Sequence, residues 1–97
     1  MPETSRLLSE HREEILAAAS RHRARTIRVF GSQAKGTATE TSDVDFLVEM
    51  DDSATLLDRA ALMLELQNLL GCNVDVVTEK ALKPRVRESI LRQAVPL

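Results

Sequence analysis

The period of the apolar positions changes several times along the chain, and each change predicts a different element. Over residues 5–24 apolar side chains recur at helical spacing, which predicts a helix. β-Branched and aromatic residues at 26–30 predict a short strand that stops at Gly31-Ser32. Glycines and small polar residues at 32–42 predict a short helical turn and a loop.

Two further strands are predicted in the second half of the chain, at residues 43–50 and 73–78. In the first, apolar side chains alternate with acidic ones, so one face is apolar and the other starts acidic. In the second, Val74 and Val76 share one face, and Asp75 lies on the other.

Helices fill the remaining positions. Thr55 and Asp58 form a capping box that begins one helix, and Gly71 ends it. Pro84 suits the first position of a last helix. The long crossover between the second and third strands permits parallel pairing, whereas the loop at 33–42 permits antiparallel pairing. We therefore expect an α/β (α+β) fold, a small mixed sheet of three or more strands with helices packed on it.

Length and composition narrow the class of protein. Ninety-seven residues are enough for one domain, so we expect 1–97 to be a single unit. The net charge of −2 argues against direct nucleic-acid binding, which usually needs a basic face. Cys72 has no second cysteine to pair with, the N-terminus lacks the pattern of a signal peptide, and the apolar runs are too short to cross a bilayer. We expect a cytoplasmic protein with no membrane contact.

Charge is distributed unevenly along the chain. Residues 37–52 carry six acidic side chains and no Lys or Arg, whereas the segment from Lys80 onward is mainly basic, with Glu88 as its acidic residue. This asymmetry predicts a cation site in the first segment and an acidic partner or anionic ligand at the second. The basic helix near the C-terminus is either a solvated face or a docking surface for a partner.

Asp43 and Asp45 are the first candidates for chemistry. Residues i and i+2 of a strand point to the same face, so the two carboxylates repel each other, and no basic residue lies nearby in the sequence. Mg²⁺ prefers such carboxylates together with phosphate and water oxygens. The alternative is an acidic strand at a sheet edge, which protects against aggregation.

Gly31-Ser32 and Asp75 complete the predicted site. A glycine allows close approach of a phosphate, amides at the start of a helical turn bind anions, and the Ser32 hydroxyl can donate to a phosphate oxygen. Asp75 interrupts an otherwise apolar strand, and a buried carboxylate needs a partner or a function. Either it pairs with a helix-borne Arg, or it faces Asp43 and Asp45, ligates metal and accepts the proton of an attacking hydroxyl.

The segment Val29–Gly36, followed after six residues by Asp43-Val44-Asp45, resembles the signature of the DNA-polymerase-β-like nucleotidyltransferases. The chain is most similar to their minimal form, the MNT domain, over almost its whole length. The resemblance implies that Gly31, Ser32, Lys35 and Gly36 hold the phosphates of ATP. It further implies that Asp43, Asp45 and Asp75 bind two Mg²⁺ ions and are the catalytic residues.

The same resemblance implies a partner. Minimal nucleotidyltransferases of this size are often antitoxins that adenylylate a tyrosine of a HEPN-domain RNase toxin, and a chain of this length is too short to hold an acceptor domain. Two positions depart from the family pattern: Gln33 and Lys35 stand where Arg is common. Lys35 keeps the charge without the bidentate fork, which leaves the nucleotide preference open.

Two other functions remain open from the sequence. The chain could be an antitoxin that neutralises its partner by binding alone, with the basic C-terminal helix as its docking surface. It could also transfer a nucleotide to a small molecule or a nucleic acid.

Overall fold

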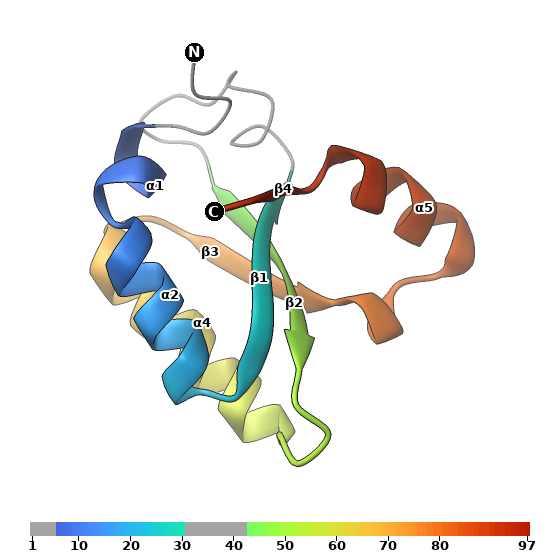
Figure 1. Cartoon of the computed structure of the whole chain (residues 1–97), viewed down its shortest axis with the longest axis horizontal. Helices are drawn as coiled ribbons and strands as arrows, with labels where there is room; N and C mark the ends of the chain where they lie inside the picture. The colour runs from blue at the N-terminus through green and yellow to red at the C-terminus, as the bar shows by residue number, and fades with distance from the viewer. Residues whose placement is uncertain (1–5, 31–42) are drawn as a thin grey trace.

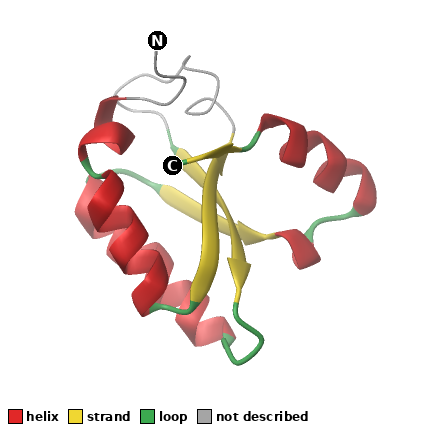
Figure 2. Ribbon diagram, in the orientation of Figure 1, coloured by secondary structure: helices red, strands yellow, loops and turns green. Residues whose placement is uncertain are grey.

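The computed structural model describes residues 6–30 and 43–97, which form a sheet with helices on both sides (Figures 1 and 2). In chain order the elements are α1 (Arg6–Glu10), α2 (Arg12–Arg21), β1 (Ala24–Phe30), β2 (Val44–Met50), α4 (Leu56–Leu70), β3 (Val74–Thr78), the 3₁₀ turn η1 (Glu79–Ala81), α5 (Pro84–Gln93) and β4 (Val95–Pro96). None of the described helices is long and apolar enough to cross a membrane.

The sheet is mixed, as the sequence predicts, with strand order β3-β2-β1-β4. β1 pairs with β2 in antiparallel fashion, and β2 pairs with β3 in parallel fashion through the α4 crossover. The short β4 pairs with β1 and forms one edge of the sheet. Sequence analysis did not predict this strand, because two residues are too few for an alternating pattern to show.

The core lies between the sheet and the helices α1, α2 and α4, which lie on the same side of it (Figure 1). The alternation read in the sequence accounts for this: Val44, Phe46 and Val48 turn their side chains toward the helices and are almost completely buried. α2 contributes Ile15, which is also fully buried. The strand that carries the predicted acidic residues is therefore held firmly from its apolar face.

The N-terminal helix is shorter and less regular than predicted. The expected helix over 5–24 is divided into α1 and α2 by a turn at His11, and β1 begins at Ala24. Arg23 has a positive φ of 65°, which turns the chain between α2 and the sheet. Ala24 pairs with Met50 across a register shift, so the strand starts two residues before the β-branched run that predicted it.

α4 begins and ends where the sequence indicates. The Thr55–Asp58 capping box is present, and Gly71 ends the helix with φ 68°. Leu62, Leu66 and Leu70 form the buried stripe. Three other leucines of the helix are exposed: Leu56, Leu57 and Leu64. These three side chains lie outside the buried stripe, although they belong to the helix that their spacing helps to predict.

Replacing Gly71 with Ala should lower the free energy of unfolding by about 1 kcal/mol, because an L-residue pays to adopt the left-handed conformation. An added Cβ would meet no atom within 4 Å, so the loss comes from backbone conformation alone. Urea denaturation of the purified variant measures it. Gly71→Asn is the matched control and should lose less, since Asn tolerates this conformation better. Equal losses for Ala and Asn would contradict this explanation.

α5 lies across the sheet from the other helices (Figure 1). None of its residues is buried, and Val86 is 47% exposed. The predicted start of the helix at Pro84 is confirmed. Val86, Ile90 and Leu91 recur at helical spacing, yet this stripe is incompletely covered.

Candidate active site

The parallel pairing of β2 with β3 brings two of the three predicted catalytic residues together. Asp45 and Asp75 are direct partners in the register, and Phe30 of β1 is the partner of Asp45 on the other side. Side chains of paired residues point to the same face of a sheet, so the two carboxylates share the face opposite to the core. Asp43 is exposed and lies one residue before the start of β2.

The electrostatic environment of Asp45 is strongly anionic. Its partial burial raises the pKa of its carboxyl above the ordinary range, and the carboxylates of Asp75 and Asp43 raise this pKa further. Among the described residues, none of the three carboxylates forms an ion pair with Lys, Arg or His. The charge repulsion that the sequence predicts is therefore present and is not neutralised by those residues.

The expectation that Asp75 is buried is wrong. Its neighbours Val74 and Val76 are buried, but Asp75 itself is exposed. The reason is that β3 is an edge strand and that Asp75 points away from the helix layer. The alternative of a salt bridge from Asp75 to a helix-borne Arg finds no support within 6–30 and 43–97, where Asp75 has no such partner.

The donor set suits a hard divalent cation, since it consists of carboxylates that repel one another. Over the two described ranges, however, no group of three Asp, Glu, His or Cys side chains converges closely enough to hold a metal ion. Asp45 and Asp75 would be the central ligands, with Asp43 reaching in from the start of β2. The magnesium ions thus remain a prediction.

The predicted phosphate-binding residues Gly31, Ser32, Lys35 and Gly36 lie outside the described residues. The elements that flank this segment are placed, because β1 ends at Phe30 and β2 begins at Val44. The segment therefore joins the two strands at the end of the sheet where Asp45 and Asp75 lie.

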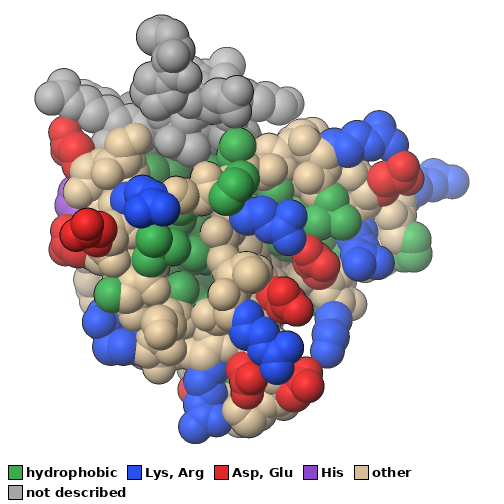
Figure 3. Space-filling model, viewed as in Figure 1, with side chains coloured by type: hydrophobic (Ala, Val, Ile, Leu, Met, Phe, Trp, Pro, Cys, Tyr) green, Lys and Arg blue, Asp and Glu red, His purple; other side chains and the backbone are tan. Residues whose placement is uncertain are grey.

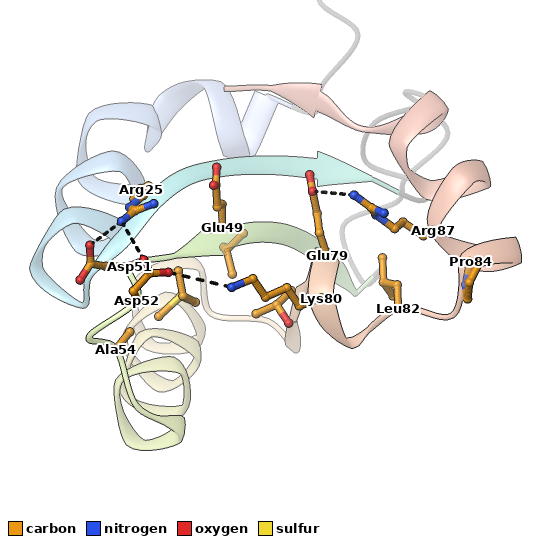
Figure 4. A pocket seen from close by; sticks show the side chains of 13 residues that line it. Arg25, Glu49, Asp51, Asp52, Ala54, Glu79, Lys80, Leu82, Pro84 and Arg87 are labelled. Atoms are coloured by element: carbon orange, nitrogen blue, oxygen red, sulfur yellow. Dashed lines mark hydrogen bonds and ion pairs between the residues drawn. The ribbon is translucent and has the colours of Figure 1, made fainter.

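A pocket lies at the end of β2 that is farther from Asp45 (Figure 4). Its volume is about 510 Å³, and β2 contributes Val48, Glu49 and Met50 to it. Glu49 is four residues beyond Asp45, which is roughly 13 Å along a strand. Sequence analysis did not predict this pocket, which forms where β1, β2, η1 and α5 meet and therefore depends on tertiary structure.

Most charges around this pocket neutralise one another. Arg25 pairs with Asp51 at 3.0 Å, Lys80 lies 3.9 Å from Asp52, and Arg87 lies 3.6 Å from Glu79. Basic and acidic side chains accordingly alternate over the lower right of the molecular surface (Figure 3). This pairing contrasts with Asp45 and Asp75, so the carboxylate pair is the better candidate for cation-dependent chemistry.

Asp51 accepts several hydrogen bonds at this end of the sheet. Hydrogen bonds from the hydroxyl and backbone N–H of Ser53, together with the Arg25 guanidinium, lower the pKa of Asp51 to about 2. A second ion pair joins Arg28 to Glu79 at 2.7 Å. Arg28 is thus bound to Glu79 and does not neutralise Asp45.

Comparison with known proteins identifies the family. The profile of the nucleotidyltransferase domain matches residues 8–97, and the chain belongs to this family. It is therefore a nucleotidyltransferase. The protein adenylyltransferase MntA of Thermococcus cleftensis is 37% identical over 95 residues, which cover 98% of this chain and 93% of the relative.

Two solved structures define the fold more closely. A candidate minimal nucleotidyltransferase is 51% identical, with a TM-score of 0.85 and coverage of 93% of this chain and 92% of that one. The complex of a tri-AMPylated Shewanella oneidensis HEPN toxin with an MNT antitoxin contains a chain that is 20% identical, with a TM-score of 0.70 and coverage of 91% and 69%. The first likeness confirms the minimal nucleotidyltransferase fold that the sequence predicts, and the second shows the fold alone.

Proposed function

We propose that this nucleotidyltransferase transfers AMP from ATP to a tyrosine hydroxyl of a HEPN-domain RNase toxin and thereby acts as its antitoxin. The observation that carries the proposal is the placement of Asp45 opposite Asp75 on the face of the sheet opposite to the core, without a neutralising cation among the described residues. Such a pair would suit divalent cations bound beside a polyphosphate.

Two relatives support the acceptor and the nucleotide. The Thermococcus cleftensis relative is named as a protein adenylyltransferase, and it matches this chain over nearly the full length of both proteins. The Shewanella oneidensis complex pairs an MNT antitoxin with a HEPN toxin that carries three AMP groups. A HEPN-domain partner as acceptor and ATP as donor of the adenylyl group therefore best fit this chain.

The proposed reaction is an in-line displacement at the α-phosphorus of ATP. The hydroxyl oxygen forms a bond to this phosphorus, the bond to the bridging oxygen of pyrophosphate breaks, and the hydroxyl proton passes to the Asp75 carboxylate. Asp43 and Asp45 would hold Mg²⁺ with Asp75. When bound, Mg²⁺ neutralises the charge of the phosphates and of the leaving pyrophosphate.

The phosphate contacts are assigned to the segment between β1 and β2. Gly31 and Gly36 would let the backbone approach the triphosphate, Ser32 would donate a hydrogen bond to it, and Lys35 would supply a positive charge. Asp45 lies at the start of β2, next to this segment in the chain. The proposed phosphate-binding segment is thus close in sequence to acidic residues of the site.

Incubation of the protein with ATP labelled in its α-phosphate, Mg²⁺ and a purified HEPN-domain toxin from the same genome should label the toxin. Peptide mass spectrometry should locate AMP on a tyrosine. ATP labelled in its γ-phosphate should leave the toxin unlabelled, because the pyrophosphate departs. A toxin that binds this protein but gains no AMP would contradict the proposed activity.

One observation favours a second function, which is neutralisation by binding alone. α5 has no buried residue and carries Arg85, Arg87 and Arg92, so it could cover an acidic surface of a toxin. Growth of cells that express the toxin separates the two functions. Asp45→Asn should fail to rescue growth if transfer neutralises the toxin, and should rescue it fully if binding is sufficient.

A further inference from the structure

One edge of the sheet offers unpaired backbone groups. β3 pairs with β2 on one side, and within the described sheet no strand lies on its other side. The N–H of Val44 donates to the carbonyl of Asn73 at 3.0 Å, which sets the alternation of the parallel ladder. Asp75 and Val77 therefore direct their backbone groups toward β2, whereas both backbone groups of Val76 and the N–H of Thr78 face the free edge. The carbonyl of Thr78, the N-cap of η1, accepts the first hydrogen bond of that turn.

A contact from α4 supports this alternation. The side-chain amide of Gln67 donates to the carbonyl of Val74 at 3.3 Å, so Val74 also presents its carbonyl away from β2. The carbonyl of Val74 is thus satisfied by the helix. Over the described ranges no such side-chain contact is made to Val76 or Thr78.

A groove runs along this free edge. It has a volume of about 370 Å³ and lies between β3, which contributes Asp75, Val76 and Val77, and the stripe of α4 at Leu56, Arg59, Ala60 and Met63. These four positions follow the i, i+3, i+4, i+7 spacing of one helix face. Leu56 is 72% exposed, so the groove presents apolar surface to its surroundings.

Charge and position indicate what the groove would hold. Arg59 borders it and forms no ion pair with another described residue, so an acidic side chain would complement it. Asp75 borders the same groove and also belongs to the candidate active site. A polypeptide bound here would lie directly beside the carboxylate that is proposed to accept the hydroxyl proton.

We propose that an extended segment of the acceptor protein binds to the free edge of β3 as an additional strand. Its backbone would bond to Val76 and to the N–H of Thr78, its apolar side chains would cover the groove, and an acidic side chain would pair with Arg59. Alternate side chains of an added strand point to the face that carries Asp75, which places the acceptor hydroxyl there. This inference rests on the proposed function and specifies how its acceptor is held.

The opposite edge of the sheet cannot serve in the same way. β4 consists of Val95 and Pro96, and proline has no N–H to donate. β4 also pairs with β1 next to α5, far from Asp75 in the strand order. The edge of β3 is thus the one that combines an open ladder, an apolar groove and a candidate catalytic carboxylate.

Filling the groove tests the proposal through kinetics. Ala60→Gln adds a neutral side chain at an exposed helix position that borders the groove, and Asn68→Gln is the matched control on the same helix outside it. Ala60→Gln should raise KM for the HEPN-domain toxin by about tenfold, a loss of about 1.4 kcal/mol in binding. KM for ATP should stay unchanged in both variants. An unchanged KM for the toxin in Ala60→Gln would overturn the proposal.

Hydrogen exchange provides a readout that does not depend on transfer. The amides of Val76 and Thr78 should exchange more slowly when HEPN-domain toxin is bound than in the free protein. Protection without any AMP transfer would refute the proposed reaction and support the docking mode. Transfer without protection would overturn the docking mode and leave the reaction standing. The absence of both would refute both.

Discussion

Asp45→Asn is expected to slow nucleotidyl transfer by about a thousandfold, which corresponds to about 4 kcal/mol of lost transition-state stabilisation. Asn keeps the shape of the side chain but removes the negative charge that would hold a divalent cation. Initial rates with saturating ATP, toxin and Mg²⁺ measure the loss. Because Asp45 is paired with Asp75 in the register, the substitution removes one member of the pair that carries the proposed function.

The same variant should fold at least as well as the wild type. Burial and the neighbouring carboxylates raise the folded-state pKa of Asp45. The stability linked to this group is therefore fully present below its unfolded pKa and is lost as pH rises through its folded pKa. At neutral pH the ionised carboxylate thus weakens the fold, so Asp45→Asn should have an equal or higher melting temperature without divalent cations.

A control and a second readout make this prediction specific. Glu49→Gln removes an acidic charge from the same strand, four residues away, and should keep near wild-type transfer. Addition of Mg²⁺ should raise the melting temperature of the wild type more than that of Asp45→Asn, because binding to the native state alone stabilises it. A fully active Asp45→Asn variant would show that this carboxylate has no role in transfer.

Phe46→Ala should lower the free energy of unfolding by about 3–5 kcal/mol. Phe46 is completely buried and is the largest such side chain in the described core. It lies next to Asp45 but points to the opposite face, so its loss opens a cavity directly behind the candidate site. Domains are stable by only about 5–15 kcal/mol, so much of the margin would be lost. Urea denaturation followed by circular dichroism measures the change.

Phe46→Leu provides the matched comparison. Leucine fills part of the same space, so this variant should lose clearly less stability than Phe46→Ala. Under conditions where Phe46→Leu remains folded, transfer should also persist, because the aromatic ring does not reach the reacting face. A loss of transfer in folded Phe46→Leu would indicate that the packing behind β2 positions Asp45 more strictly than the register alone.

The sequence predicts the features of this protein that depend on local patterns. Alternation in β2 gives its buried face correctly, and the Thr55–Asp58 box and Gly71 mark both ends of α4. The pairing of Asp45 with Asp75 is one of the two arrangements that the sequence leaves open, since a long helical crossover permits parallel strands. These features follow from spacing, capping and backbone conformation, which act over a few residues.

The features that the sequence does not reveal depend on contacts between distant elements. Asp75 is exposed because β3 forms an edge of the sheet, and strand order is not encoded in the apolar run around it. Leu56 and Leu64 look like core residues, but the buried stripe of α4 is fixed by which helix face meets the sheet. The sequence around His11 contains no Pro or Gly that would indicate the turn between α1 and α2.

The parallel register of β2 and β3 has a consequence for folding kinetics. Asp45 and Asp75 are thirty residues apart in the chain, and they become neighbours when this non-local pairing forms. Non-local strand pairing is slow because loop-closure entropy is lost before contacts compensate for it. A nascent chain or a partly folded intermediate would therefore contain well-formed helices before it contains a catalytic pair. Transfer activity would consequently appear late in refolding, after most of the helical signal has been recovered.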